Sequence, residues 1–411
     1  MLQGNEIEII AKTDMEIAEV IAEHRKNIMF NQAKVLKAFK NNLLSDFHFQ
    51  DSSGYGYGDT GREVLESIYA DIFCTEDALV RTNIVSGTHA IYLALKASLQ
   101  IGDLVVTLGK PYDTLQVALG IAGDDPLSLI KSGVKVEEAP FDAIKNLTLL
   151  DEYLKRKPKV FFIQRSRGYS LRTSLSIKMI KKIITYVKSI NNDIIVVVDN
   201  CYGEFVEKKE PSEVGADLIA GSLIKNPGGG LAPSGGYIAG KRNLVEKAAI
   251  CLTSPGLGKD IGSSTTNKRL LFQGLFLAPM IVFQAVETAI FAAKMMENMG
   301  YTVTPGYCEE RTDIVQVLLL NNQERLNLFC KTIQEYSPVS SHFAPEAGDL
   351  PGYESKVIMA AGTFVQGASI ELTADSPIRE PYAVYLQGSL TAEHGKIAIL
   401  KAALRARNLR Q

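Results

Sequence analysis

Apolar residues near the start of the chain recur at intervals of three and four, which is typical of a helix. Ile17, Val20 and Ile21 form one such group, and Val35 and Phe39 belong to a second. The pattern predicts an N-terminal helical arm that extends to about residue 47. The Gly-, Ser- and Asp-rich segment HFQDSSGYGYGDTGREVLE then predicts a loop that passes into a helix at about residue 62.

From about residue 79, short apolar runs alternate with segments of helical period. One predicted strand covers residues 80–85. Another covers Ile194–Val198, whose continuous β-branched run is typical of a strand buried on both faces of a parallel sheet. The segment between them has an apolar face at helical spacing, formed by Ile177, Ile180, Ile183, Ile184, Val187 and Ile190. This alternation predicts a doubly wound α/β domain with a mostly parallel sheet.

The C-terminal part has a mixed pattern. The segments KVIMAAGTF and ASIELT are strand-like, whereas residues 323–335 and the basic C-terminal end have helical periodicity. These elements predict a smaller α+β domain. We therefore expect an N-terminal arm and loop over residues 1–60, a large α/β domain over 61–295 and a small domain over 296–411.

Composition narrows the class of protein. The 411 residues include 44 Lys and Arg and 46 Asp and Glu, so no overall field favours nucleic acid or an anionic membrane. Five cysteines without C-x-x-C spacing argue against a disulfide framework or a zinc site and indicate a reducing cytoplasm. The most membrane-like segment, residues 270–286, is interrupted by polar residues and is expected to be a core or subunit-interface helix. We expect a cytoplasmic protein without nucleic-acid, membrane or metal partners.

Three predicted strand ends carry unusual chemistry. Ser86, Gly87 and Thr88 follow one strand and open a helix, which suits an anion. Asp199 ends a strand that should be buried, where a carboxylate needs a cation. Lys225 follows an apolar run and precedes Asn-Pro-Gly-Gly-Gly. Each alone has a simpler explanation: a helix cap, an internal ion pair, or a solvated lysine on a turn.

Together the three ends suit one ligand, a phosphorylated pyridine aldehyde. A lysine amine forms a Schiff base with the aldehyde, an aspartate keeps the pyridine nitrogen protonated, and a glycine-containing helix start holds the phosphate. The cation missing beside Asp199 would be the pyridinium. Tyr112, in GKPYDTL after the strand LVVTLG, is placed to cover the ring face.

At this point the sequence resembles the fold-type-I pyridoxal-phosphate enzymes, in particular the cystathionine and methionine lyase-related family whose members are often labelled aluminium-resistance proteins. The resemblance covers nearly the whole chain and includes GYGYGDTGREVLE, SGTHAIYLAL, GKPYDTL, IQRSRGY, VDNCYGEFVE, AGSLIKNPGGG and PIREPYAVYLQGSLT. It implies a homodimer or homotetramer with an active site shared between subunits.

The resemblance also implies residue roles. The Schiff-base lysine would be Lys225, which with Tyr112 would be catalytic, and Asp199 would hold the pyridinium. The phosphate ligands would be Ser86, Gly87, Thr88 and Ser222, joined by Tyr57 and Arg62 from the neighbouring subunit, with Tyr55 as an alternative to Tyr57. The substrate carboxylate would be bound by Arg379, with Arg165 a second candidate for the substrate or the cofactor O3′.

The function expected from these roles is a pyridoxal-phosphate-dependent carbon–sulfur lyase that acts on a sulfur-containing amino acid by β- or γ-elimination. Lys225 would remove the α-proton, helped by burial and nearby cations that lower its pKa. Two alternatives are an aminotransferase and a stress or metal-resistance protein that binds the cofactor with little turnover.

Overall fold

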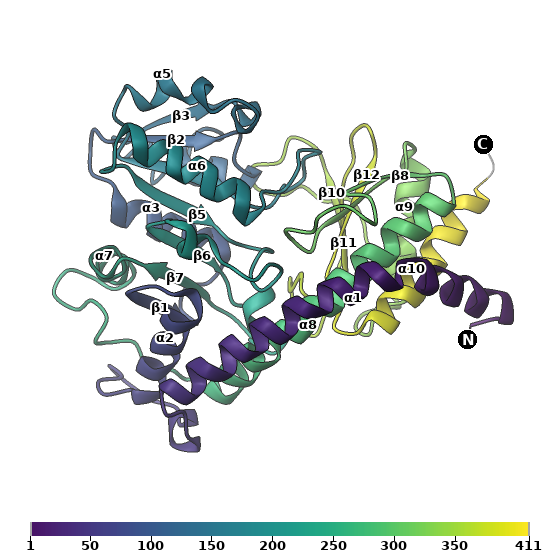
Figure 1. The fold of residues 1–411 in the computed structure, drawn as a ribbon, viewed down its shortest axis with the longest axis horizontal. Helices are drawn as coiled ribbons and strands as arrows, with labels where there is room; N and C mark the ends of the chain where they lie inside the picture. Colours follow the sequence, from purple (N-terminus) through teal and green to yellow (C-terminus); the bar gives the residue numbers. More distant parts are fainter. Residues whose placement is uncertain (1, 410–411) are drawn as a thin grey trace.

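The structure, a computed structural model, describes residues 2–409 of the chain (Figure 1). The longer helices are α1 (Gly4–Asn41), α2 (Thr60–Phe73), α3 (Gly87–Ser98), α4 (Asp113–Leu119), α5 (Asp151–Leu154), α6 (Ile177–Ile190), α7 (Arg242–Leu252), α8 (Lys268–Asn298), α9 (Gln323–Glu335) and α10 (Ala392–Asn408). The short 3-10 helices are η1 (Asp46–Phe49), η2 (Phe141–Ile144), η3 (Leu147–Leu150), η4 (Pro211–Val214) and η5 (Asn226–Gly228).

The strands form two sheets. The first contains β1 (Asp77–Arg81), β2 (Leu104–Leu108), β3 (Lys135–Ala139), β4 (Val160–Gln164), β5 (Ile195–Asp199), β6 (Leu218–Ser222) and β7 (Gly236–Gly240). The second contains β8 (Thr302–Thr304), β9 (Gln316–Leu319), β10 (Val357–Ala360), β11 (Thr373–Pro377) and β12 (Ala383–Gln387).

The first sheet has the spatial order β1-β7-β6-β5-β4-β2-β3. Strand β7 runs antiparallel to both neighbours, and the other neighbours are parallel. The predicted mostly parallel sheet is therefore confirmed. Because parallel strands end at the same edge, Gln164, Asp199 and Ser222, the last residues of β4, β5 and β6, lie along one edge.

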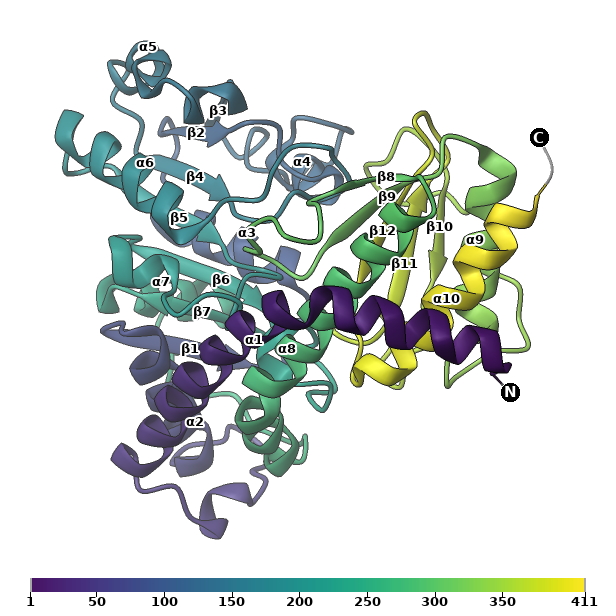
Figure 2. The ribbon, with the colours of Figure 1, turned by 45° about the vertical axis from the view of Figure 1, so that its right-hand side comes forward.

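Helices cover both faces of this sheet, as Figures 1 and 2 show. Alternation along each strand decides which side chain meets which layer. In β5, Val196 and Val198 join the core formed with α2, α6 and α8, whereas Val197 joins the core formed with α3 and α7. The continuous apolar run was thus correctly interpreted as a strand buried on both faces.

The second sheet is antiparallel throughout, in the order β10-β11-β12-β9-β8, and α9 and α10 pack against each other beside it (Figure 2). Helix α8 runs from the first sheet to the second, and α1 lies along it. Among residues 2–409, α8 alone is long and apolar enough to cross a membrane, yet 67% of its most apolar window is buried. Its composition therefore fits a core helix.

Three predicted element bounds are wrong. Helix α1 ends at Asn41 rather than near residue 47, and β1 ends at Arg81 rather than at Val85. Residues 82–85 form a loop in which Ile84 is buried in the core and Val85 is 73% exposed, so a buried loop residue gave the segment the apolar content of a strand. The segment ASIELT forms turns for the same reason, and β11 begins at Thr373. The boundary near residue 295 stays a prediction, since α8 passes through it.

Candidate active site

A cavity of about 280 Å³ opens at the edge where β4, β5 and β6 end. Its size is close to the lower limit for small-molecule sites. The large domain supplies most of its wall, and Tyr353 from the small domain completes it. The lining residues are Val85, Ser86, Gly87, Thr88, Tyr112, Asp113, Thr114, Gln164, Ser166, Gly168, Tyr169, Asp199, Cys201, Tyr202, Ser222, Ile224, Lys225 and Tyr353.

One end of the cavity is formed by the N-terminus of α3. Ser86 caps this helix, because its Oγ accepts a hydrogen bond from the backbone N–H of His89 at 3.1 Å. The first N–H groups of a helix have no partner within the helix and favour anions. A Cβ on Gly87 would lie 3.2 Å from Cys201 Sγ and 3.3 Å from Ser222 Cβ, so glycine lets the turn pack closely on the ends of β5 and β6. The serine is therefore a cap, and the end remains suited to a phosphate.

Asp199 lines the cavity as a buried carboxyl group. It accepts a hydrogen bond from the backbone N–H of Cys201 at 3.0 Å. Burial raises the pKa of Asp199, and the charge of Lys225 partly opposes this effect. Asp199 takes part in none of the ion pairs found among residues 2–409, so a cationic group of a ligand would relieve the cost of its burial.

Lys225 lies at the end of the turn that follows β6, with its Nζ 3.9 Å from the centroid of the Tyr202 ring. Burial lowers the pKa of Lys225, but the acidic groups of Cys201, Tyr202 and Asp199 outweigh burial, so the pKa lies well above its ordinary value. The expectation of a lowered pKa is therefore wrong for this state of the protein, because the groups around the amine are acids and not cations.

The glycines after Lys225 serve packing. A Cβ on Gly229 would lie 2.2 Å from the carbonyl oxygen of Gly274 in α8, and a Cβ on Gly274 would lie 2.2 Å from the carbonyl oxygen of Gly228. Side chains at these positions would separate the turn from α8. The glycine density thus fixes the turn that carries Lys225 against a buried helix, and it is not explained by close approach of a ligand.

Tyr112 is fixed at both ends. Its backbone N–H donates to Gln164 Oε1 at 2.9 Å, and its hydroxyl donates to Thr88 Oγ1 at 2.8 Å. Burial raises the pKa of Tyr112, so the phenol is protonated near neutral pH. Tyr112 therefore links the phosphate end of the cavity to the end of β4.

The residues present fit pyridoxal phosphate. The structure brings seven of the predicted residues to one cavity: Ser86, Gly87, Thr88, Tyr112, Asp199, Ser222 and Lys225. A helix N-terminus for a phosphate, a buried carboxyl group outside any ion pair among residues 2–409, and an amine in the same cavity match the phosphate, the pyridine nitrogen and the aldehyde of this molecule.

Two predicted residues lie outside the cavity, in the loop before the large domain. Tyr57 is 67% exposed. Arg62 is buried, and its guanidinium donates to the carbonyl oxygens of Gly56, Gly262 and Asp260 at 3.0, 2.7 and 3.0 Å. Arg62 therefore connects two loops of its own chain, which leaves Tyr57 the better placed of the two for the predicted contact with a neighbouring subunit.

Arg165 lies behind the cavity wall and not in the cavity. Its fully buried guanidinium donates to Asn200 Oδ1 at 2.7 Å and pairs with Glu207 at 2.8 Å and Glu210 at 3.4 Å. Alternation explains the placement: Gln164 and Ser166 line the cavity, so the residue between them points away. The prediction that Arg165 binds substrate or cofactor is corrected accordingly.

Arg379 does not line this cavity; it lines a separate hollow that shares Tyr169 with the cavity. Its Nη2 donates to the carbonyl oxygen of Tyr169, a cavity residue, at 3.0 Å. The charge of Arg379 also lowers the pKa of Asp113, which lines the cavity, although burial of that carboxyl group is the larger effect and raises it. Arg379 is thus next to the cavity residues Tyr169 and Asp113 without lining the cavity itself, and its predicted role stays a prediction.

Sequence reasoning missed several cavity residues. Gln164 carried a usable signal, since it is the polar residue that ends the apolar strand KVFFIQ. Tyr169 and Tyr353 carried none. Their ring centroids lie 5.5 Å apart, and Tyr169 also packs at 5.3 Å from Tyr385 of β12. These rings come together only through the docking of the small domain.

Comparison with known proteins finds relatives that match nearly the whole chain. The family model for methionine gamma-lyase matches residues 6–407. An uncharacterised Bacillus subtilis protein, YnbB, is 47% identical over 403 residues, or 96% of each chain. A crystal structure from Listeria monocytogenes, of a protein described as a candidate cystathionine beta-lyase involved in aluminium resistance, has 48% identity and a TM-score of 0.92 over 97% of this chain and 99% of that one.

A Clostridium novyi structure described as a carbon–sulfur lyase involved in aluminium resistance has 45% identity and a TM-score of 0.94 over 98% of this chain and 96% of that one. The pyridoxal-phosphate-dependent protein YhfS from Escherichia coli is only 16% identical, with a TM-score of 0.63 over 94% and 97% of the two chains, and shows a shared fold alone. The fold is therefore that of the fold-type-I pyridoxal-phosphate enzymes. With this fold, and a family model that covers nearly all of its length, the chain belongs to the methionine gamma-lyase family.

Proposed function

We propose that the protein is a cytoplasmic, pyridoxal-phosphate-dependent carbon–sulfur lyase that acts on a sulfur-containing amino acid. The observation that carries the proposal is the convergence of Lys225, Asp199 and the N-terminus of α3 in one cavity. Family membership and the carbon–sulfur lyase description of the Clostridium novyi relative support it.

When bound, pyridoxal phosphate supplies an aldehyde that attaches amino groups covalently and a ring that accepts electrons from the substrate Cα. The protein supplies the surroundings. The N–H groups of Gly87 and Thr88, with the hydroxyl of Ser222, would hold the phosphate. The Asp199 carboxylate would hold a positive charge at the pyridine nitrogen, and the Tyr112 ring would pack against the cofactor ring.

Lys225 moves the proton. The Asp199 charge helps to hold a proton on Lys225 Nζ in the described state. Once Asp199 is paired with a cation, that contribution is neutralised, and the pKa of the amine falls relative to the described state. Nζ can therefore take the α-proton of the substrate and return it to the leaving sulfur, with the Tyr112 hydroxyl as a second donor.

Arg379 binds the substrate carboxylate in this proposal, since a guanidinium matches a carboxylate bidentately; its contact with the cavity residue Tyr169 supports the assignment. The reaction breaks one carbon–sulfur bond and releases a thiol. Hydrolysis of the remaining fragment by one water gives a keto acid and ammonia.

The test measures visible absorbance and product release. Purified protein is incubated with pyridoxal phosphate, dialysed, and supplied separately with cystathionine, cysteine and methionine. We expect a visible absorbance band that Lys225→Ala abolishes, and equal amounts of keto acid and ammonia from one of the three amino acids. Lys182→Ala, an exposed lysine of α6, is the matched control and should keep both.

Other outcomes separate the alternatives. Keto acid formation that requires a second keto acid and releases no ammonia would indicate an aminotransferase. A Lys225-dependent band without turnover of any amino acid would indicate a cofactor-binding protein of another role. Protein that acquires no band at any cofactor concentration would contradict the proposal.

A further inference from the structure

A groove of about 800 Å³ lies between α1, the start of α6 and the two loops that carry residues 207–214 and 308–311. It shares no lining residue with the candidate active site, and its volume is within the range of small-molecule sites. Four exposed lysines line it and take part in none of the ion pairs found among residues 2–409: Lys178, Lys181, Lys208 and Lys209. Positive charge in this groove is therefore available to a ligand.

Contacts within the chain fix the loop that carries two of these lysines. The Glu207 carboxylate pairs with Arg165 at 2.8 Å and accepts from the backbone N–H of Ile177, the first residue of α6, at 3.0 Å. On the other side, Asn31 of α1 donates to the carbonyl oxygen of Glu207 at 3.1 Å. The loop is thus tied to both helices, and the lysines of the loop and of α6 lie around one groove.

Arg311 adds a buried cation to the lining of the groove. It is 2% exposed and belongs to no ion pair among residues 2–409. Its guanidinium donates to two uncharged acceptors, Gln316 Oε1 at 2.6 Å and the carbonyl oxygen of Gly306 at 3.3 Å, and its buried Nε has no hydrogen-bond partner. A buried cation without a counter-charge is costly, so an anion in the groove would relieve that cost.

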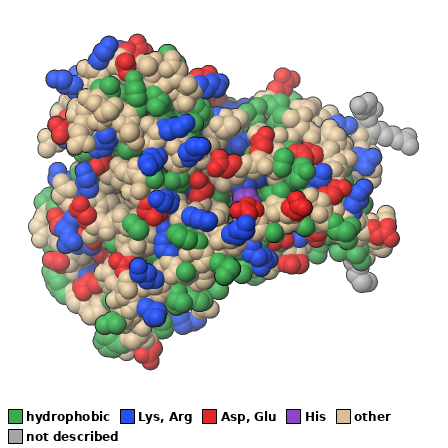
Figure 3. Space-filling view, in the orientation of Figure 1, with side chains coloured by type: hydrophobic (Ala, Val, Ile, Leu, Met, Phe, Trp, Pro, Cys, Tyr) green, Lys and Arg blue, Asp and Glu red, His purple; other side chains and the backbone are tan. Residues whose placement is uncertain are grey.

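Most of the acidic side chains in the groove are already neutralised. Three of the five pair with cations of the chain: Glu23 with Lys26, Glu207 with Arg165 and Glu213 with Lys34. The remaining two, Glu309 and Glu310, are exposed and oppose the lysines from the 308–311 loop. Four lysines and a buried arginine against two unpaired carboxylates leave the groove with a net positive charge. The space-filling view shows Lys and Arg side chains over α6 and along α1, with acidic side chains among them (Figure 3).

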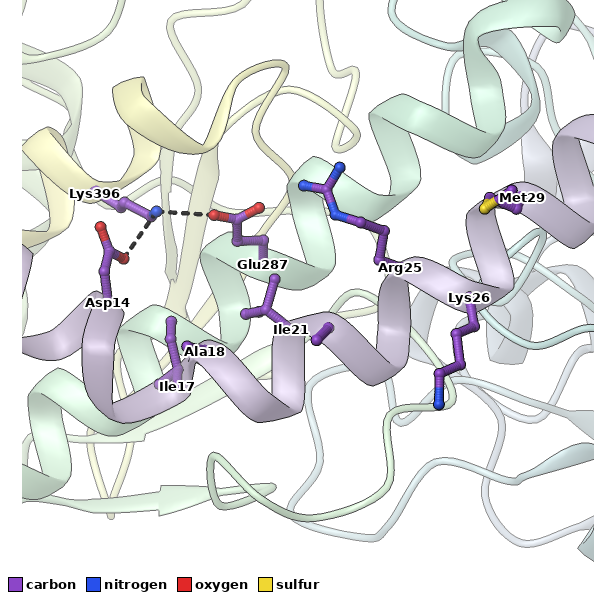
Figure 4. Close-up of a pocket in the computed structure, with 10 residues that line it drawn as sticks. Asp14, Ile17, Ala18, Ile21, Arg25, Lys26, Met29, Glu287 and Lys396 are labelled. Carbon is purple, nitrogen blue, oxygen red and sulfur yellow. Dashed lines mark hydrogen bonds and ion pairs between the residues drawn. The ribbon is translucent and has the colours of Figure 1, made fainter.

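A second groove along α1, of about 570 Å³, shows that unpaired cations are not a general feature of this surface (Figure 4). There Lys396 Nζ lies 2.9 Å from Asp14 Oδ1 and 2.8 Å from Glu287 Oε1. Lys26 is also in an ion pair, and Arg25 lies over an aromatic ring of α8 at 5.1 Å. All three cations that line that groove thus have a partner within the chain, whereas the lysines beside α6 do not.

We propose that the groove beside α6 binds a small organic polyphosphate. Its cations lie on two elements, α6 and the loop after β5, and a single anionic group would meet only some of them, whereas a chain of phosphates can contact both. Val20, Ile177 and Val214 also line the groove and provide an apolar surface for the uncharged part of the ligand. This site is independent of the proposed lyase function.

The test measures the binding of ATP by isothermal titration calorimetry at low salt without divalent cations. The protein is first saturated with pyridoxal phosphate, because the N-terminus of α3 also suits a phosphate. Lys181→Gln and Lys208→Gln each remove one charged contact, so each should weaken binding by about three- to tenfold. Lys182→Gln is the matched control, since Lys182 is exposed on α6 and does not line the groove, and should bind ATP as the wild type does. Glu310→Gln removes an opposing charge and should tighten binding.

The location of bound ATP is checked by nuclear magnetic resonance. His24 lines the groove, and its ring-proton signals, assigned with His24→Gln, should shift when ATP is added. The signals of His89, in the first turn of α3, should not shift. Shifts at His89 alone would place ATP at α3 and overturn the proposal.

The calorimetry has its own contrary outcomes. No binding at millimolar ATP, or binding that neither lysine variant weakens, would overturn the site. Inorganic triphosphate that binds as tightly as ATP would overturn the role of the apolar lining. If the protein takes up no pyridoxal phosphate, the proposed function fails, and the same titration of the same variants still decides this proposal.

Discussion

Two buried carboxyl groups lie at and after the end of β5: Asp199 is the last residue of the strand, and Glu210 lies in the loop that follows. They differ in whether a cation of the chain pairs with them. Glu210 is almost completely buried and well partnered: it accepts from Phe205 N–H and Asn200 Nδ2, both at 2.9 Å, and pairs with Arg165. Asp199, at the end of the strand, accepts one backbone N–H and has no cation within ion-pair distance among residues 2–409. One carboxylate is satisfied within the chain, and the other faces the cavity unsatisfied.

A third carboxyl group between them, Glu204, follows neither pattern. Its Oε1 accepts from the hydroxyl of Tyr237 at 2.8 Å, and Oε2 has no hydrogen-bond partner. Burial raises the pKa of Glu204 to about 8, so it is protonated at neutral pH. The three groups show that burial alone does not mark a functional carboxylate. The informative feature of Asp199 is burial at a cavity without a cation.

The largest expected effect on stability comes from removing the cation that pairs with Glu210. Arg165→Met removes the cation from Glu207 and Glu210 while keeping a long apolar side chain. Leaving buried charges unpaired costs about 3–5 kcal/mol of unfolding free energy. Urea unfolding followed by circular dichroism measures this loss. Arg156→Met is the matched control: Arg156 pairs with Glu137 at 2.7 Å on the surface, and its loss should cost at most about 1 kcal/mol. Equal losses in the two variants would contradict the comparison.

Asp199, the carboxyl group outside any ion pair, should respond in the opposite way: its substitution should affect activity and leave stability nearly unchanged. Asp199→Asn keeps the shape and removes a buried charge that forms no ion pair among residues 2–409, so the unfolding free energy should stay within about 0.5 kcal/mol or rise. Keto acid release should fall by about 10²–10³-fold, because the charge opposite the pyridine nitrogen is lost.

Asp217→Asn is the control for that variant. Asp217 pairs with Lys188 at 2.8 Å and Lys241 at 2.6 Å, far from the cavity lining. This variant should lose stability and keep its turnover. If Asp199→Asn were the variant that lost stability and kept turnover, Asp199 would be a structural residue.

The raised pKa of Glu204 predicts that the unfolding free energy depends on pH. Between pH 4.5 and about 8 the native state keeps a proton that the unfolded state releases, so the unfolding free energy contributed by this group falls as the pH rises. Glu204→Gln lacks this loss and keeps an acceptor for Tyr237. Relative to wild type, the variant should gain about 3 kcal/mol between pH 5 and pH 8, since each pH unit contributes up to about 1.4 kcal/mol. Urea unfolding at both pH values measures the gain, and parallel pH curves for the two proteins would contradict it.

The sequence could predict the centre of the site because the relevant residues follow buried apolar runs. Asp199 and Lys225 come after β5 and β6, and parallel strands bring such ends together without any knowledge of side-chain contacts. The helix start at Ser86 was likewise visible, although the end of β1 was placed four residues too late. The apolar runs and the rule that parallel strands end at one edge of a sheet were sufficient to predict that these residues lie close together.

The remaining residues depend on information that is not local. Whether Gln164 or Arg165 faces the cavity depends on where β4 ends and on the alternation beyond it, so an arginine at a strand end was mistaken for a ligand. The same alternation sends Asn200 behind the wall and Cys201 into the cavity. Tyr353 reaches the site from a loop of the small domain, and only the packing of two domains determines that contact.

The smallest expected effect comes from removing the Tyr237 hydroxyl, which donates a hydrogen bond to Glu204. Tyr237→Phe removes a buried hydroxyl that donates to Glu204 at 2.8 Å and faces Asn200 Nδ2 at 3.4 Å. The cost should be about 1 kcal/mol, the net value of one buried hydrogen bond, because a protonated carboxyl group loses less than a charged one when its donor is removed. Tyr55→Phe, in an exposed loop, should be neutral. Urea unfolding at pH 6 compares the two, and a loss above about 3 kcal/mol would mean that Glu204 is ionised in the native protein. Glu204 would then be another buried carboxylate outside any ion pair among residues 2–409. The absence of a paired cation would in that case no longer distinguish Asp199 from a structural carboxyl group.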